Sequence, residues 1–181
     1  LKDSTPESIR DLAILELAYA TGLKTSPLMS LDLENVRLEF PAHLLIRSKD
    51  NLFNVFHLHT RASEALQNYI QNARPQLLNR CRANARVKAD ADADAALFLN
   101  NRGQRLTRQG FWLIIKHYAK EAGLDNKVSA NTLRHSFAVH MLEGGAQIDQ
   151  VQQLLGHANL ASTQIYAELR KQPKLHVVGA K

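Results

Sequence analysis

The chain has 181 residues, 45% of them hydrophobic, which is enough for one globular domain with a buried core and excludes a disordered chain. Its formal net charge of +6 favours a polyanionic partner, above all nucleic acid. No apolar run approaches the roughly 20 residues of a membrane span, and the first residues do not resemble a signal peptide. The single cysteine, Cys81, excludes an intramolecular disulfide and suits a reducing cytosol.

The first half of the chain predicts two helices followed by a small antiparallel sheet. The first helix has Thr5 as its N-cap and Pro6 in its first turn, and Gly22 stops it. A change from helical to alternating hydrophobic spacing then marks the start of the sheet. A short helix is expected at residues 26–31, and strands are expected at residues 36–40, 44–48 and 52–58, the last two joined by the tight turn Lys49-Asp50-Asn51.

The second half is predicted to be mostly helical. Pro75 follows the expected end of its first helix, and Trp112 is expected in the core. Residues 79–96 are first basic and then alternate Ala with Asp, which predicts a solvated, mobile loop rather than a metal site. Helices are expected at residues 61–73, 106–122, 132–143 and 148–155, with an extended apolar segment at residues 96–100. These elements together predict an α+β fold, mostly α-helical, with a small antiparallel three-stranded sheet.

Three polar side chains, Arg134, His157 and Tyr166, stand at ends or turns of the helices expected in the last third of the chain, where they can converge. An arginine guanidinium is a planar fork that binds two phosphate oxygens. A histidine can donate to a third oxygen or move a proton, and a tyrosine hydroxyl becomes a nucleophile when its proton is removed. This set predicts attack on a phosphodiester through a phosphotyrosine intermediate, with cationic side chains in place of a metal.

Each of these side chains also has an ordinary structural interpretation. Arg134 is expected at the edge of the apolar face of its helix. A tyrosine such as Tyr166, at the end of a helical run, is most often a core residue with a hydrated hydroxyl, and His157 after a glycine is most often a helix C-terminal residue. His135 and His140 are five residues apart, which is not the spacing of a zinc-binding helix, so neither is assigned to a metal.

Residues 132–166, TLRHSFAVHMLEGGAQIDQVQQLLGHANLASTQIY, resemble the catalytic core of the tyrosine recombinases, especially the Xer-type and phage-integrase branch. That family shows an H-x-L-R-H segment, then L-G-H, then a tyrosine nucleophile. Residues 10–36 resemble the family's opening with its T-G-L-R segment, and residues 44–58 resemble its second and third strands, whose turn carries a catalytic lysine. The resemblance implies that residues 1–181 form the C-terminal catalytic domain, ending in a tail at residues 170–181, without the family's N-terminal DNA-clamping domain.

The resemblance also implies roles for individual residues. Arg134 matches the second family arginine, a phosphate clamp, and His157 matches the L-G-H histidine, a phosphate donor. Tyr166 matches the nucleophile, and Lys49 matches the hairpin lysine, the general acid that protonates the leaving 5′ oxygen. The reaction so implied is site-specific DNA strand exchange through a 3′-phosphotyrosyl link, without metal, nucleotide or other cofactor.

Three positions depart from the family pattern. Lys24 stands at the first arginine, Asn131 at the histidine of H-x-L-R, and Pro27 at the acidic residue three positions after the first arginine. Lysine keeps the charge but lacks the bidentate fork, and asparagine cannot relay a proton near neutral pH. Losing a preorganised donor costs about 10²–10³ in rate, and losing an acid–base group costs about 10²–10⁴. The departures therefore predict either a slow enzyme or a DNA-binding relative that no longer cuts.

Double-stranded DNA is the partner that the resemblance implies. On that DNA the chain is expected to assemble with itself, as a tetramer in the resembled family, or with a related recombinase, in a bacterial-type cytosol and in association with the nucleoid. Two alternatives to a recombinase stay open: a catalytically inactive DNA-binding protein on the same fold, and a helical interaction protein whose basic charge is incidental. The target sequence does not follow from the chain, because bases are read by side chains whose placement sequence alone does not reveal.

Overall fold

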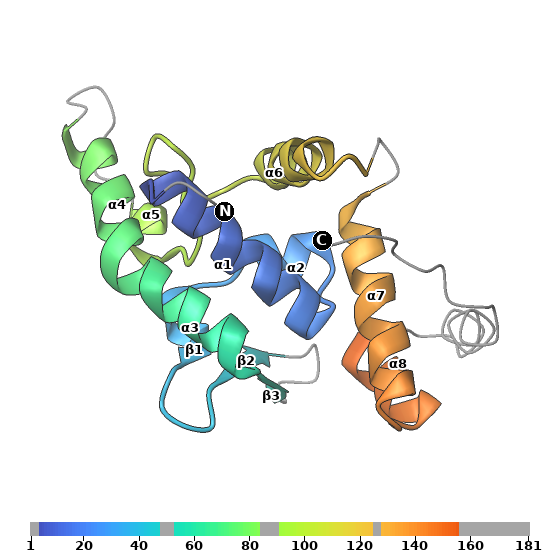
Figure 1. Ribbon diagram of the computed structural model, residues 1–181. Helices are drawn as coiled ribbons and strands as arrows, with labels where there is room; N and C mark the ends of the chain where they lie inside the picture. Colours follow the sequence, from blue (N-terminus) through green and yellow to red (C-terminus); the bar gives the residue numbers. More distant parts are fainter. Residues whose placement is uncertain (1–3, 48–52, 84–90, 125–127, 156–181) are drawn as a thin grey trace.

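The computed structural model describes residues 4–47, 53–83, 91–124 and 128–155 (Figure 1). The helices are α1 (Pro6–Thr21), α2 (Thr25–Met29), α3 (Thr60–Asn68), α4 (Arg74–Ala83), α5 (Ala91–Ala95), α6 (Arg108–Glu121), α7 (Ala130–Glu143) and α8 (Ile148–Leu155), with a 3-10 turn η1 (Leu33–Asn35) and a π-helical turn η2 (Tyr69–Ala73). The strands are β1 (Val36–Arg37), β2 (His43–Arg47) and β3 (Phe53–His57), which form an antiparallel sheet in that order. The predicted fold class is confirmed. No helix in the described ranges has the length and apolar character needed to cross a membrane.

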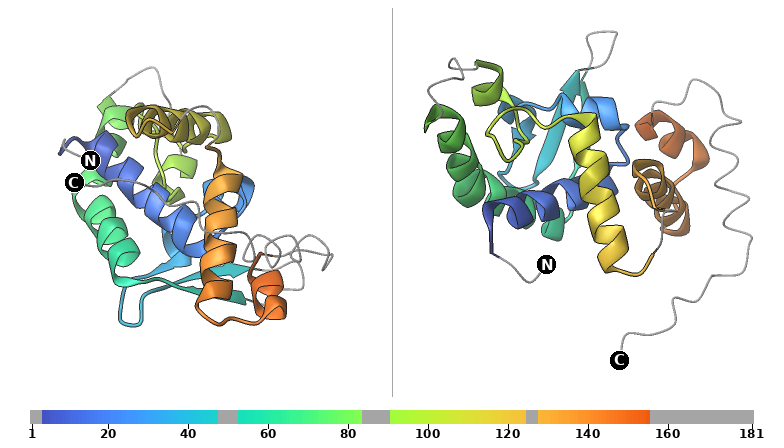
Figure 2. Two further views of the ribbon diagram at one scale, coloured as in Figure 1. Left: turned by 45° about the vertical axis from the view of Figure 1, so that its right-hand side comes forward. Right: turned by 90° about the horizontal axis from the view of Figure 1, so that it is seen from above.

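Helix α1 begins and ends as its sequence predicts. The Thr5 hydroxyl accepts a hydrogen bond from the Ser8 backbone N–H at 3.2 Å, which satisfies one of the open donors of the first turn. Gly22 closes the helix in the left-handed region, at φ 60°, and its N–H donates to the Ala18 carbonyl. Figures 1 and 2 show that α1 is central, because it runs between α3 on one side and α7 on the other.

The first strand of the sheet is shorter than predicted. Alternation in the sequence predicted a strand to Phe40, whereas β1 contains only two residues. The antiparallel register pairs Arg37 with His43, so the chain must reverse direction within residues 38–42, and Phe40, in this reversal, is fully exposed. Strands β2 and β3 agree with the prediction to within one residue at each end. The turn expected at residues 49–51 lies outside the described residues.

Pro75 does not end the helix that precedes it, contrary to the prediction. Helix α3 runs into the π-helical turn η2 and then into α4, so the helical run continues to Ala83. The wider π turn just before Pro75 accommodates the missing N–H and the ring of a proline that would break a regular α-helix. The short helix expected at residues 26–31 is also displaced by one or two residues, to the bounds of α2.

The mobile loop predicted at residues 79–96 is helical at residues 79–83 and 91–95, which the structure describes. Residues 79–83 belong to α4, and the Ala-Asp alternation forms α5. Ala93 and Ala96 are fully buried, whereas Asp92 and Asp94 are exposed. The Ala-Asp alternation, which suggested low complexity, therefore buries small alanine side chains and leaves the charged aspartate side chains in solvent.

Two arginines anchor α5 to the rest of the chain. The buried Arg74 guanidinium donates to three backbone carbonyls within residues 93–96, acceptors that a short helix leaves open. Arg105 Nη2 lies 2.6 Å from Asp32 and 2.7 Å from Asp92. The hydrogen bond from Arg105 lowers the pKa of Asp92, so the stability that this carboxylate contributes is present at neutral pH and lost as the pH falls through the lowered pKa.

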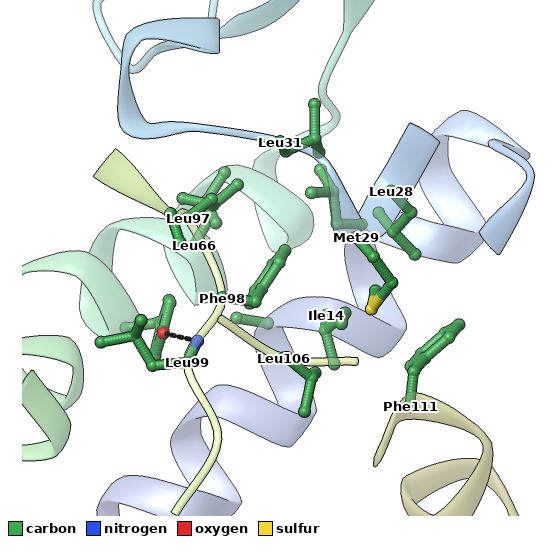
Figure 3. Close-up of a cluster of buried hydrophobic side chains, with 14 of the residues drawn as sticks. Ile14, Leu28, Met29, Leu31, Leu66, Leu97, Phe98, Leu99, Leu106 and Phe111 are labelled. Carbon is green, nitrogen blue, oxygen red and sulfur yellow. Dashed lines mark hydrogen bonds between the residues drawn. The ribbon is translucent and has the colours of Figure 1, made fainter. Parts of the chain in front are cut away.

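A buried hydrophobic cluster packs α1 against the extended segment that was predicted at residues 96–100 (Figure 3). Ile14 of α1 and Leu97 and Leu99 of the segment are fully buried in it. The segment makes isolated bridges at Ala96 and Leu99, and its backbone bends at Leu97 and Phe98 between them, so it is not the regular extended segment that was expected. The buried Tyr69 hydroxyl accepts a hydrogen bond from the Leu99 N–H at 3.0 Å, which ties the segment to η2.

Trp112 is exposed, contrary to the prediction. The buried face of α6 contains Phe111, Ile114 and Ile115. Successive residues of a helix are rotated by about 100°, so Trp112 points away from that face. Its side chain is 52% exposed, and the Lys116 ammonium lies 5.9 Å from the centroid of its ring.

Candidate functional site

Arg134 is buried in α7, not at the edge of an apolar face as predicted. The helix begins with a capping box, in which the side chains of Ser129 and Thr132 each accept from the backbone N–H of the other. Its buried face contains Phe137 and Leu142 and also Arg134, which is 5% exposed. A buried guanidinium is costly unless it is hydrogen-bonded, so its partners determine what it does in the fold.

The Arg134 guanidinium joins three segments that are distant in the sequence. Nη1 donates to the Gly22 carbonyl at 2.6 Å, and Nη2 donates to the Leu155 carbonyl at 2.5 Å. These partners are 112 and 21 residues away along the chain. Gly22 precedes Lys24 by two residues, and Leu155 precedes His157 by two residues. Arg134 therefore connects the beginnings of two other motifs that the sequence assigned to the site.

Gly22, the C-cap of α1, lies directly against side chains of α7 and α8. A Cβ atom added to Gly22 would lie 2.4 Å from Phe137 Cδ1 and 3.0 Å from Leu155 Cδ2. Its φ of 60° is also one that residues with a side chain rarely adopt. Glycine at this position therefore does more than end a helix, because it lets the turn that leads to Lys24 pack directly on α7 and α8.

Lys24 and Asn131 are both described, and both are exposed. Lys24 occupies the N-cap position of α2, in extended backbone conformation. Asn131 lies one turn before Arg134 on α7, and residues three apart share a helix surface. Lys24 and Asn131, two of the three departures from the family pattern, therefore lie within three residues of Gly22 and Arg134, in segments that the guanidinium joins.

Lys49, His157 and Tyr166 lie outside the described residues, so their placement stays a prediction. The structure does describe the strand that follows Lys49, β3, and the helix that precedes His157, α8. An open hollow of about 410 Å³ lies where β3 meets α7 and α8, lined by Asn54, Val55, Met141, Gln150 and Leu154. The strand that follows Lys49 and the helix that precedes His157 therefore border the same hollow.

A second tie between α1 and α7 could not be found from the sequence. The Tyr19 hydroxyl and His140 Nδ1 form a short hydrogen bond between the two helices. Their rings also meet edge to face, with centroids 5.7 Å apart and planes at 71°. The two residues are 121 positions apart, and neither belongs to a motif that the sequence singled out for chemistry. Together with Arg134, this pair sets the position of α7 along α1.

Two groups with raised pKa values lie between α1 and α6. Burial raises the pKa of Asp11, against the opposing effect of the neighbouring Arg10 guanidinium. Burial and the nearby Asp11 carboxylate raise the pKa of Tyr118 to about 12. Both groups belong to a polar contact between α1 and α6. Within the part of the chain that the structure describes, no group of three or more His, Cys, Asp or Glu side chains could hold a metal ion.

Comparison with known proteins agrees with the motifs. The chain is 46% identical over 171 residues to the tyrosine recombinase XerC of Roseiflexus sp. (strain RS-1). The aligned region covers 93% of this chain and 50% of that protein. It is 42% identical over 168 residues to the tyrosine recombinase XerD of Listeria monocytogenes serotype 4b (strain F2365), and this aligned region covers 93% of this chain and 53% of that protein. The chain therefore spans about half the length of the curated relatives it matches.

Solved structures give the same picture for the fold. The crystal structure of XerA recombinase superposes with a TM-score of 0.71 at 28% identity, covering 93% of this chain and 58% of that one. XerH recombinase bound to a palindromic difH substrate superposes with a TM-score of 0.73 at 22% identity, covering 95% and 46%, a likeness that concerns the fold alone. The model of the phage integrase family matches residues 1–173. With that match across nearly its whole length, and with tyrosine recombinases as relatives, this chain belongs to the phage integrase family.

Proposed function

We propose that this chain is the strand-cleaving and rejoining domain of a site-specific DNA recombinase. The observation that carries the proposal is the Arg134 guanidinium, which joins the turn before Lys24, the helix of Asn131 and the helix before His157. Four of the six residues assigned by resemblance therefore lie on, or within two residues of, segments that one side chain holds together. The Xer recombinases among the relatives support the same activity.

The chemistry proposed for the site is a transesterification at one phosphodiester. The Tyr166 oxygen attacks phosphorus and gives its proton to water, while Arg134, Lys24 and His157 stabilise the charge that develops on the phosphate oxygens. The bond to the 5′ oxygen breaks, and Lys49 protonates that leaving group. Attack by the 5′ hydroxyl of a partner strand on the 3′-phosphotyrosyl link reverses these steps, so the number of phosphoester bonds is conserved and no external energy source is needed.

Arg134 is assigned two tasks in this scheme. Its guanidinium donates hydrogen bonds to the Gly22 and Leu155 carbonyls. These two bonds fix the plane and position of the group before DNA arrives. We infer that Arg134 organises the site and also contacts the phosphate, so it cannot be exchanged for lysine, which has no planar fork.

Lys24 and Asn131 make the proposed enzyme a weak one. Lys24 supplies charge to the phosphate without a bidentate grip, and Asn131 can hydrogen-bond but cannot accept the Tyr166 proton at neutral pH. The same two residues favour the second candidate, a DNA-binding relative that does not cut. The proposal for an attenuated enzyme and this alternative differ in one observable, which is the covalent protein–DNA adduct.

The test is a suicide substrate, a nicked duplex from which the 5′ end leaves after cleavage, so that the covalent adduct accumulates. We expect a slow but detectable adduct that disappears in Tyr166→Phe, because phenylalanine has no nucleophilic oxygen. DNA binding without any adduct would identify the non-cutting relative. Absence of both binding and adduct would instead support the helical interaction protein.

Double-stranded DNA is the partner proposed for the chain, and its binding should depend steeply on salt. The net charge of +6 and the phosphate-directed residues motivate this expectation. Each phosphate neutralised by a lysine or arginine releases counterions, so the logarithm of the binding constant should fall linearly with the logarithm of the salt concentration, with a slope of about −0.9 per contact. Fluorescence anisotropy with a labelled duplex measures the slope. An affinity that is equal at low and moderate salt would contradict the proposal.

Self-assembly on DNA is proposed to involve the C-terminal tail, residues 170–181, which lies outside the described residues. Leu175, Val177 and Val178 form a small apolar group after Pro173, suited to docking on a neighbouring subunit. Truncation after Arg170 should therefore reduce assembly on DNA and leave the melting temperature of the monomer unchanged. Native gel electrophoresis with the duplex measures assembly. If assembly survives truncation, the tail is not the docking segment.

A further inference from the structure

We propose that His43 and His57 form a binding site for a divalent first-row transition-metal ion on the outer face of the sheet. The site is separate from the residues of the proposed recombination chemistry. It lies where β2 begins and β3 ends, at the end of the two strands remote from the segment that joins them. Its test is metal binding itself, so its outcome does not depend on the proposed function.

The two histidines lie opposite each other on neighbouring strands. His43 and His57 are direct partners in the register of β2 and β3. Just beyond them the Leu58 N–H donates to the Ala42 carbonyl at 2.9 Å, which makes the histidines a non-hydrogen-bonded pair, the type in which opposite side chains approach most closely. Their ring centroids are 6.1 Å apart.

Both rings lie on the face of the sheet that points away from the core. Side chains of neighbouring residues in a strand point to opposite faces. Leu44 and Phe56, the next pair along the ladder, are buried at 0% and 5% exposure. The histidine pair is therefore on the other side, where His57 is exposed and His43 is half-buried. An ion can reach this face from solvent without any change in the core.

His43 is already oriented as a metal ligand. Its Nδ1 lies 2.8 Å from the Pro41 carbonyl, and because a carbonyl can only accept, Nδ1 holds the hydrogen. In the neutral ring the lone pair is then on Nε2, which is available for coordination. Histidines that bind metals almost always donate their other ring N–H to a carbonyl, a carboxylate or water in this manner.

The chemistry of the donors selects the class of ion. Neutral imidazoles without a carboxylate suit Zn²⁺, Cu²⁺ or Ni²⁺ rather than Mg²⁺ or Ca²⁺. Nitrogen–metal bonds of about 2 Å place two imidazoles that share an ion at a centroid spacing close to the one observed, after small side-chain rotations. Water completes the coordination, since two side chains are fewer than the three or four of a high-affinity protein site.

Two neighbours limit the affinity and the ligand set. His59 Nδ1 accepts a hydrogen bond from the Ala62 N–H as the N-cap of α3, so its lone pair is already used. Arg37 is the β1 partner of His43, and its guanidinium bonds to backbone carbonyls of its own segment. Its positive charge weakens the attraction of a cation. The site is therefore expected to bind in the micromolar range rather than tightly.

The experiment compares Zn²⁺ binding to the 181-residue chain and to single variants by isothermal titration calorimetry. His43→Asn and His57→Asn should each lower the affinity at this site by about tenfold or more, since even outer partners of metal ligands are worth 10–100-fold. His59→Asn is the matched control, because asparagine keeps the N-cap while removing a nearby imidazole, and it should bind as the wild type does. In Cu²⁺-loaded protein, electron paramagnetic resonance should show two coupled nitrogens that decrease to one in either variant.

Folding of the variants and metal binding by them can be measured separately. Circular dichroism without metal checks that each variant is folded, and the exposed His57 gives a variant with little effect on the fold. With metal, the melting temperature of the wild type should rise and that of His57→Asn should not, because an ion that binds only the folded state stabilises it by mass action. No binding by the wild type, or equal binding by the wild type and both strand variants, would overturn the proposal. Loss of binding in His59→Asn alone would do the same.

Discussion

Restoring both departures at once, Lys24→Arg with Asn131→His, should raise the rate of covalent adduct formation through Tyr166 by at least about a hundredfold. Arginine returns a two-point grip on the phosphate, worth about 10²–10³ in rate at a comparable site. Histidine returns a group that can take the tyrosine proton near neutral pH, worth about 10²–10⁴. The exposed positions of Lys24 and Asn131 mean that neither change disturbs the buried core. Denaturing gel electrophoresis of a labelled suicide substrate measures the rate.

Adduct formation by the two single variants and by a Tyr166→Phe control shows whether the gain in the double variant comes from the proposed chemistry. Each single change should give less adduct than the pair, and their effects should not simply add, because both act on one transition state. Tyr166→Phe in the double variant should abolish the adduct. Fast adduct formation by the unaltered chain would show that Lys24 and Asn131 suffice. A double variant that binds DNA but stays inactive would show that the defect lies elsewhere, for example at Pro27.

Gly22→Ala should destabilise the fold by about 2–5 kcal/mol. The left-handed backbone costs a residue with a Cβ about 1–2 kcal/mol, and inserting a methyl into a well-packed contact costs about 1–3 kcal/mol. Here that methyl would lie 2.4 Å from Phe137. The free energy of unfolding, from urea denaturation followed by circular dichroism, measures the loss.

Gly123→Ala is the matched control for this contact. Gly123 has φ +67°, close to that of Gly22, but a Cβ added there would meet nothing within 4 Å. It should therefore show only the backbone part of the loss. Equal destabilisation by the two variants would mean that the contact with Phe137 is not tight. A smaller side chain opposite, in Gly22→Ala with Phe137→Leu, should cost less than the sum of the two single changes.

Local capping signals predicted both ends of α1. Thr5 and Gly22 delimit this helix as expected, and α7 ends at Glu143 as expected, because helix ends depend on side chains and backbone freedom within a few residues. The motif around Arg134 and Tyr166 was specific enough to predict the family, which the comparisons confirm. The roles of the six site residues stay proposals.

Other expectations failed because their outcome depends on distant partners. A π turn absorbs Pro75 within a continuous helical run, and no local rule predicts where such a turn forms. The Ala-Asp repeat became α5 because Arg74 and Arg105, from other parts of the chain, bind its ends and its aspartates. Trp112 is exposed because the side of α6 that faces the core was set by its neighbours in space.

The sequence by itself determined the fold class and the family, since hydrophobic period, caps and a dense motif are all local properties. Only the tertiary structure decided what Arg134 does: a residue expected at the margin of a helix face is buried, with its guanidinium on the Gly22 and Leu155 carbonyls. The physical reason is that a charge enters a core only where acceptors converge on it. Those acceptors come from α1 and α8, and their convergence exists only once three distant segments are packed together.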